Sequence, residues 1–210
     1  MRLREAVVVA ALGPGMLALV SAMLAPAPAG PLPGAPAGTA TLAIEPAASA
    51  LTFTISRPGE TIDGAAHEFS GEIVFDPSQL SAGSSVVLRV EAAALATGNR
   101  LRDHRMRASH LEVERFPEIV FRSTSIQVGE ERHESGTRKA LVEGTLSLHG
   151  VERTVLVPAV IRYDNGTLTA EGSVDLTYSD YGIPIPRFLW LVMDDDIKVR
   201  FRFMAGQAAK

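Results

Sequence analysis

The chain contains no cysteine among its 210 residues. Disulfide bonds, thiolate metal sites and a cysteine nucleophile are therefore excluded. An excess of positive charge is also missing, because 20 lysines and arginines stand against 24 aspartates and glutamates, a formal net charge of −4. Without a basic footprint, no nucleic-acid partner is expected. The sequence also lacks the Gly-x-Ser-x-Gly motif of the α/β-hydrolases and the ligand spacing of an EF-hand.

The N-terminal residues have the three-part pattern of an export signal. Arg2 and Arg4 supply a short positive region, residues 6–24 carry no charge, and small residues that suit cleavage follow. We expect residues 1–29 to be a signal peptide or, if uncleaved, a membrane anchor, since the stretch approaches the roughly 20 residues that span a bilayer. Residues 30–40, rich in Pro, Ala and Gly, are predicted to be a linker. The expected location is the periplasm.

From residue 41 onward, apolar and polar residues alternate with the period of a half-buried β-strand. The alternation is clearest over residues 51–56, where Leu, Phe and Ile are separated by hydroxyl residues. Near the end of the chain, four apolar residues over 197–203 alternate with three basic ones. Further strands are expected over residues 41–45, 68–75, 85–91, 118–125, 140–148, 154–163 and 167–177. Asn165-Gly166 predicts a tight hairpin, because both residues tolerate positive φ.

Helix is expected in one region only. Residues 99–114 are charged and compatible with one or two short helices, which Pro117 ends before the next strand. Eight or nine amphipathic strands with almost no helix are typical of an antiparallel sandwich or a closed barrel. A barrel of about eight strands has an interior that holds side chains or one small ligand. The alternation is the same in both cases, so it leaves a filled and a hollow barrel open.

Four segments resemble motifs of the YceI-like family and keep that family's order. They are residues 99–104 (NRLRDH), 111–121 (LEVERFPEIVF), 142–151 (VEGTLSLHGV) and 178–183 (YSDYGI). The resemblance implies a YceI-like domain over residues 41–205: an all-β, extended, antiparallel eight-stranded lipocalin-like barrel with one or two short helices, after an N-terminal signal segment. It also implies binding of long isoprenoid or fatty-acyl lipids in a central apolar tunnel, without established catalytic residues.

Two residues depart from the family pattern. Tyr178 stands where the family usually carries Arg, so a charged contact from that position is not expected to be kept. His110 falls where the family usually has an aromatic residue, so the helical segment is expected to pack differently there.

Polar clusters offer little evidence of a metal site, and no cofactor is expected. Asp103, His104 and His110 lie close together in sequence, but the two histidines are six positions apart, unlike the i, i+4 spacing of ligands on one helical face. We interpret Asp103 with Arg102 as a clamp that holds the helical segment over the barrel mouth. The three aspartates 194–196 are interpreted as a solvated turn, because no EF-hand spacing surrounds them.

The inward-facing apolar residues are the candidates for ligand contacts, with ordinary core packing as their alternative. They are Phe53, Ile55, Phe69, Ile73, Val90, Phe121, Leu146, Leu148, Val174, Phe201 and Phe203. Trp190 is a further candidate, because it lies in an apolar run just after two prolines. That run is interpreted as a loop at the tunnel mouth or as a strand buried on both faces.

Together these features predict a carrier or reservoir for a long-chain apolar lipid, and not an enzyme. Shielding an alkyl chain contributes about 0.8 kcal/mol per buried CH₂, so the site needs few polar residues. One alternative is an enzyme acting on a lipid-like substrate with His149 or Asp103, although a hydrogen bond from His149 to its own hairpin is the preferred interpretation. Another is a tethered interaction module with a filled barrel. Transient contact with a membrane or a membrane protein stays open, and so does the oligomeric state.

Overall fold

The computed structural model describes residues 38–130, 133, 136–188 and 191–207. Its strands are β1 (Ala40–Ile44), β2 (Ala50–Arg57), β3 (Glu60–Ala66), β4 (Phe69–Phe75), β5 (Ser85–Glu91), β6 (Leu95–Ala96), β7 (Glu118–Val128), β8 (Arg138–Leu148), β9 (Val151–Asp164), β10 (Thr167–Thr177), β11 (Arg187–Phe188), β12 (Leu191–Val192) and β13 (Asp196–Gln207). One helix, α1 (Arg100–Arg105), continues into a single π-helical turn over Met106–His110. In this part of the chain no helix has the length and apolar character needed to cross a membrane.

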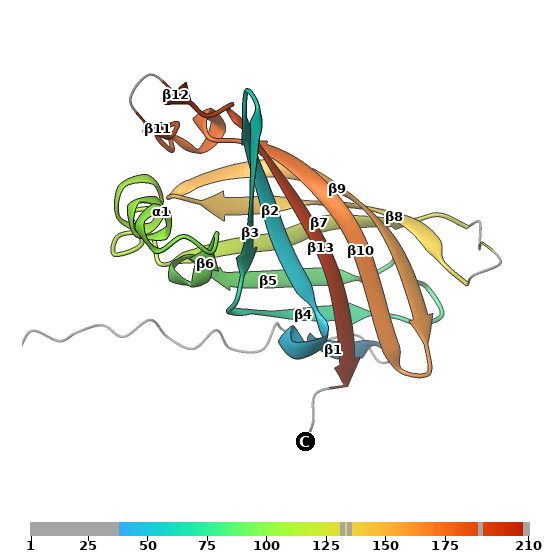
Figure 1. Ribbon diagram of the computed structural model, residues 1–210. Helices are drawn as coiled ribbons and strands as arrows, with labels where there is room; N and C mark the ends of the chain where they lie inside the picture. The colour runs from blue at the N-terminus through green and yellow to red at the C-terminus, as the bar shows by residue number, and fades with distance from the viewer. Residues whose placement is uncertain (1–37, 131–132, 134–135, 189–190, 208–210) are drawn as a thin grey trace, which may run out of the picture. The chain divides into compact units, whose positions relative to one another are not determined.

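Eight long consecutive strands form a closed antiparallel barrel (Figure 1). Three of the eight are interrupted: β1 and β2 flank the 3₁₀ turn Pro46–Ala48, β3 and β4 are separated by two residues, and β5 passes through Ala92–Ala94 into β6. Each long strand pairs with the next one along the chain. The last strand, β13, closes the ring, since it pairs with β10 on one edge and with β1 and β2 on the other. The predicted eight-stranded barrel is therefore confirmed.

Tight turns of the expected chemistry join the long strands. Asn165 and Gly166 have φ values of 48° and 81°, the positive pair that a two-residue hairpin of type I′ requires. His149 and Gly150, between β8 and β9, adopt the same conformation with φ of 53° and 75°.

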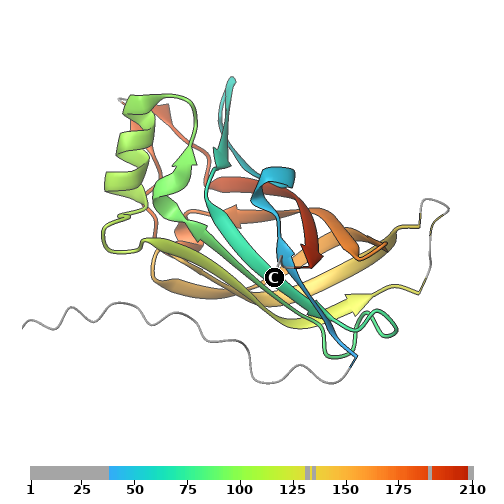
Figure 2. The ribbon, with the colours of Figure 1, turned by 90° about the horizontal axis from the view of Figure 1, so that it is seen from below.

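The two ends of the barrel differ, and both Figure 1 and Figure 2 show the difference. We call the end that carries α1, the β11–β12 ribbon and the β8–β9 turn the helix end. The opposite end, with the β9–β10 turn, is the far end. At the helix end, the backbone N–H of Asp194 donates to the carbonyl of Ser56 at 2.8 Å, which joins the segment before β13 to β2.

The helical segment begins where the sequence predicts. The Asn99 side chain accepts hydrogen bonds from the backbone N–H groups of Leu101 and Arg102, both at 3.1 Å, as an N-cap residue does. Regular helix then ends at His110, earlier than the expected residue 114.

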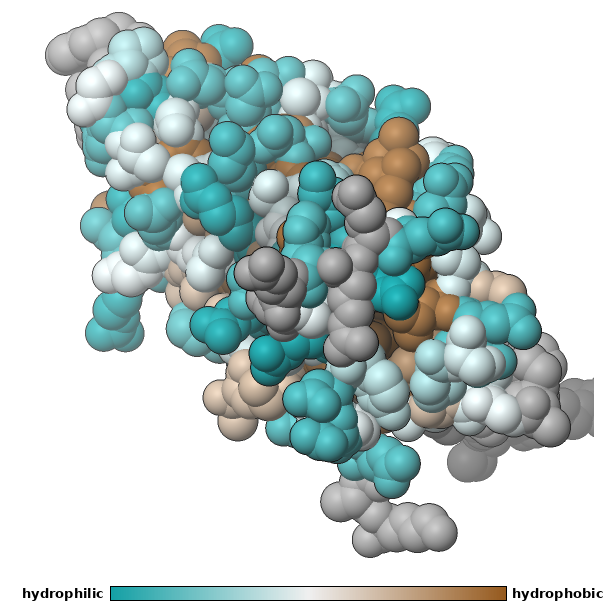
Figure 3. Space-filling model, turned by 90° about the vertical axis from the view of Figure 1, so that its right-hand side faces the viewer, coloured by the Kyte–Doolittle hydropathy of each residue, from teal (hydrophilic) through white to brown (hydrophobic). Residues whose placement is uncertain are grey.

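The barrel surface is mostly polar. On the face in Figure 3, hydrophilic residues predominate and hydrophobic residues appear in separate groups. The large apolar residues that are exposed on the strands are Leu141, Leu156, Val160 and Val192. Three of them lie together on the outer face of the β8–β9 pair, because Leu141 is in register with Pro158, which lies between Leu156 and Val160 on β9.

Candidate ligand cavity

The interior of the barrel is hollow. A cavity of about 660 Å³ lies inside it, lined by residues from the barrel strands, from α1 and from the connections at the helix end. Ten of the eleven inward-facing candidates line it: Phe53, Ile55, Ile73, Val90, Phe121, Leu146, Leu148, Val174, Phe201 and Phe203. Phe69 does not; it is buried against Phe203, with ring centroids 5.9 Å apart, and belongs to the core. Trp190 lies outside the described residues.

Small residues on one wall keep the interior open. Ala140 on β8 is in register with Ala159 on β9, and Ala159 is in register with Gly172 on β10. All three face the interior, where most inward positions of a filled barrel carry large side chains. The ring of Phe201, from the register partner of Gly172 on β13, lies over that glycine at less than van der Waals distance for an added Cβ. The small side chains of Ala140 and Ala159, and not a break in the alternation, thus leave the space.

Asp103 holds the start of α1 to the segment before it. Its carboxylate accepts hydrogen bonds from the backbone N–H of Thr97 at 2.8 Å and from its hydroxyl at 2.6 Å. Arg102 donates to the hydroxyl oxygen and the carbonyl of the same threonine. Burial alone would raise the pKa of Asp103, but the Thr97 hydrogen bonds and the charges of Arg107 and Arg102 outweigh it and lower that pKa. The hydrogen bonds of Asp103 and Arg102 to Thr97 form the predicted clamp.

His149 does not bond its own hairpin, so that prediction is wrong. Its Nδ1 lies 3.2 Å from the carbonyl oxygen of Tyr181, which only accepts, so Nδ1 donates. Its Nε2 is buried without a hydrogen bond and lies 3.4 Å from Glu112 Oε1. The ring also packs edge-on against Phe116, at 4.7 Å between centroids. His149 joins three segments at the helix end and does not line the cavity.

The two departures from the family pattern fall on the cavity lining. Tyr178 is 7% exposed and lines the cavity. Burial, together with the nearby Asp195 carboxylate, raises the pKa of Tyr178, so it presents a neutral phenol where a charged residue was usual. His110 places Nδ1 2.8 Å from the carbonyl oxygen of Pro184 and ties the helical segment to the β10–β11 connection.

Asp194 and Asp195 lie in the connection before β13, as predicted, but Asp196 already belongs to that strand. Asp195 accepts hydrogen bonds from the backbone N–H and the hydroxyl of Ser179, and these bonds lower its pKa. Among the residues that the structure describes, no three acidic or histidine side chains gather closely enough to hold a metal ion.

Sequence patterns missed the polar side chains that line the cavity. Arg57 and Glu60 flank the β2–β3 turn, Arg105 closes α1, and Arg187 begins β11. No periodicity marks them, because they stand at turns and element ends. Only the positions of these turns around the barrel bring them to one cavity.

A closed, up-and-down antiparallel barrel around one large apolar cavity defines a lipocalin-like binding barrel. The family model described as a YceI-like domain matches residues 42–205. The chain therefore belongs to the YceI-like family, as its motifs indicated.

Relatives of the chain are distant. A UPF0312 protein of Pseudomonas savastanoi pv. phaseolicola is 29% identical over 155 residues, 70% of this chain and 77% of that protein. A UPF0312 protein of Vibrio cholerae is 27% identical over 113 residues, and this alignment spans 53% of the chain and only 56% of the relative.

Solved structures share the fold at low identity. The Burkholderia cenocepacia protein BcnA has a TM-score of 0.68 with 19% identity, covering 77% of this chain and 98% of BcnA. A polyisoprenoid-binding domain of Saccharophagus degradans, implicated in plant cell wall breakdown, has a TM-score of 0.62 with 16% identity, covering 79% and 98%.

Proposed function

We propose that the protein is a non-catalytic carrier or reservoir that holds a long-chain apolar lipid, of isoprenoid or fatty-acyl type, inside its barrel in the periplasm. The observation that carries the proposal is the cavity itself. Its volume of about 660 Å³ falls within the range of roughly 300–1,000 Å³ typical of small-molecule sites, and apolar residues make up most of its wall. The similar fold of the S. degradans polyisoprenoid-binding domain supports the choice of ligand class.

The two alternatives have less support. A filled interaction module conflicts with a cavity of this size. An enzyme would need a reactive group over the ligand, yet neither Asp103 nor His149 is among the cavity-lining residues, and both are engaged with backbone groups. The export pattern of residues 1–29 supports the periplasmic location.

Bound lipid is the direct test. The full chain, expressed in a bacterium and purified without detergent, is expected to show an added mass by native mass spectrometry, and organic extraction should release a long-chain lipid. After delipidation, a series of straight-chain alcohols should displace a neutral fluorescent probe with an affinity that rises about fourfold per CH₂, because each buried CH₂ contributes about 0.8 kcal/mol.

Two results would contradict the proposal: a protein that neither carries nor takes up any lipid, or affinities that do not depend on chain length. Location is tested separately by cell fractionation. The full chain is expected in the periplasmic or inner-membrane fraction, and a chain lacking residues 2–29 is expected in the cytoplasm.

A further inference from the structure

The charged residues that line the cavity are all at its helix end. They are Arg57, Glu60, Arg102, Arg105 and Arg187. The lining thus contains four guanidinium groups and one carboxylate, an excess of three positive charges, although the formal net charge of the whole chain is −4. At the far end, the lining contains no charged side chain among the residues that the structure describes. The cavity is therefore polarised along the barrel axis.

Some of these charges are already engaged. Arg57 pairs with Glu60 across the β2–β3 turn, and Arg102 donates to Thr97. By contrast, Arg105 and Arg187 make no ion pair with any residue that the structure describes. These two guanidinium groups are available to a ligand. Each presents a planar fork of N–H donors that matches a carboxylate or a phosphate.

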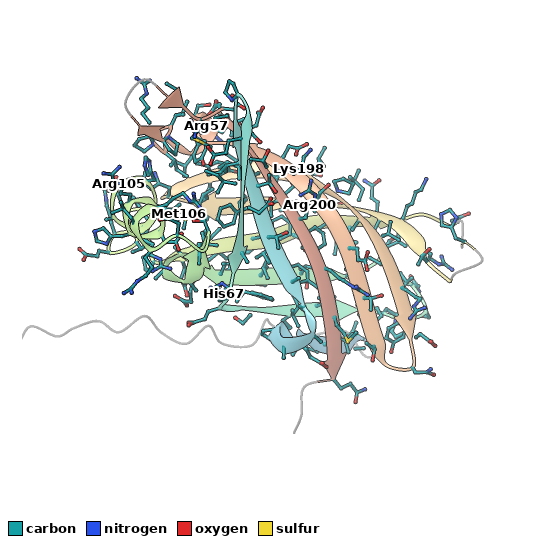
Figure 4. All side chains as sticks on the ribbon, in the orientation of Figure 1. Arg57, His67, Arg105, Met106, Lys198 and Arg200 are labelled. Atoms are coloured by element: carbon teal, nitrogen blue, oxygen red, sulfur yellow. The ribbon has the colours of Figure 1, made fainter. Side chains whose placement is uncertain are left out.

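The apolar wall extends directly to these charges. Met106 follows Arg105 and lines the cavity, and Leu101, 66% exposed, lines it from the first turn of α1. Figure 4 shows Arg57, Arg105 and Met106 at the helix end of the barrel. A long-chain molecule in the cavity thus has water, an apolar rim and two unpaired cations at the same end. This arrangement suits an amphiphile with an anionic head.

We propose that the cavity mouth is a headgroup site, in which Arg105 and Arg187 bind the oxyanion of a long-chain lipid, a phosphate monoester or a carboxylate, while its tail occupies the barrel. This rests on the proposed function, because the tail needs the apolar cavity. The excess positive charge also orients the ligand, since a head at the far end would meet no cation in the described part of the lining.

The test compares dodecyl phosphate with dodecanol by displacement of a neutral fluorescent probe from the delipidated full chain. The phosphate is expected to bind about tenfold or more tightly than the alcohol, because hydrogen bonds to charged groups are the stronger ones. The double variant Arg105→Gln/Arg187→Gln should lose this difference and keep its affinity for dodecanol. Raising the salt concentration should reduce the preference of the wild type by screening.

The matched control removes two cations elsewhere. Lys198→Gln/Arg200→Gln changes the net charge equally, but these side chains project from β13 away from the cavity (Figure 4) and do not line it. This variant should keep the preference for the phosphate.

Each result separates the two proposals. Binding of both ligands with equal affinity, or an undiminished preference in the arginine variant, overturns the headgroup site and leaves the carrier function standing. Failure of both ligands to bind refutes the carrier function. Inorganic phosphate is the third competitor. If it displaces the probe as well as dodecyl phosphate does, the anion site does not bind a lipid headgroup and the assignment is wrong.

Discussion

Shortening the cavity from its far end tests the link between structure and ligand most directly. Ala159 lies on β9 toward the far end, is 9% exposed and lines the cavity. Its register partners Ala140 and Gly172 are small, and the ring of Phe201 from β13 lies over Gly172 beside it. Ala159→Leu adds three carbon atoms there.

The expected magnitude follows from the displaced tail. Three added carbons exclude about three methylenes of a ligand that fills the cavity, which costs about 2.4 kcal/mol of binding energy at about 0.8 kcal/mol per CH₂. The affinity for a long-chain alcohol should therefore fall about 50-fold. A short alcohol, whose tail does not reach the far end, should bind as it does to the wild type.

Titration of an 8-carbon and an 18-carbon alcohol against a bound fluorescent probe measures both effects. Val160→Leu is the control, because Val160 is the next residue on β9 and is 45% exposed. The reasoning is refuted if Ala159→Leu remains folded yet binds the long alcohol as tightly as the wild type. It is also refuted if the affinities for both alcohols fall equally, since the effect of the substitution would then not depend on chain length.

Three smaller predictions concern stability. Gly172→Ala places a Cβ against the Pro158 carbonyl oxygen and the Phe201 ring, so it should lower the free energy of unfolding by about 1–3 kcal/mol in urea titrations; an unchanged midpoint would contradict this contact. Asp103→Ala removes two hydrogen bonds to Thr97 and should cost about 1–3 kcal/mol at pH 7. Because the pKa of Asp103 is lowered in the folded state, its stabilisation is present above about pH 4 and is lost as the pH falls through the folded pKa. The two proteins should therefore converge in acid, and a constant gap down to pH 2 would exclude this origin.

Most of the barrel was predictable because one physical pattern repeats along it. Wherever large apolar residues alternate with polar ones, as over residues 51–56, the strand forms as expected. Strand β3 was missed because its inward residues are Ile62, Gly64 and Ala66, and only one of them is large. The space over Gly64 is filled by the ring of Phe53 from the paired strand. A sequence window cannot contain that information, since the filling side chain belongs to another strand.

Prediction of the site is limited for the same reason, since its shape depends on side chains from different strands. The alternation placed ten apolar candidates on the cavity lining but did not distinguish a hollow barrel from a filled one. That difference depends on two small residues, Ala140 and Ala159, meeting in register on β8 and β9, whereas the ring of Phe201 fills the space over Gly172 on β10. The contacts of His149 likewise depend on Tyr181 and Glu112, which lie more than 30 residues away in the chain.

Affinity for a lipid and selectivity among lipids are expected to depend on different parts of the cavity. Burial of an alkyl chain contributes nearly the same free energy per CH₂ whatever the lipid, so the apolar wall sets how tightly and how long a tail is held. Discrimination among lipids of equal length must then arise where charged groups line the cavity, at the helix end with Arg105 and Arg187. Because Ala159 lies toward the other end, the losses from Ala159→Leu and from the arginine variant should add within about 0.5 kcal/mol for a long-chain phosphate. A combined loss far from that sum would mean that the two ends are coupled, for example because the ligand shifts along the barrel when one end is changed.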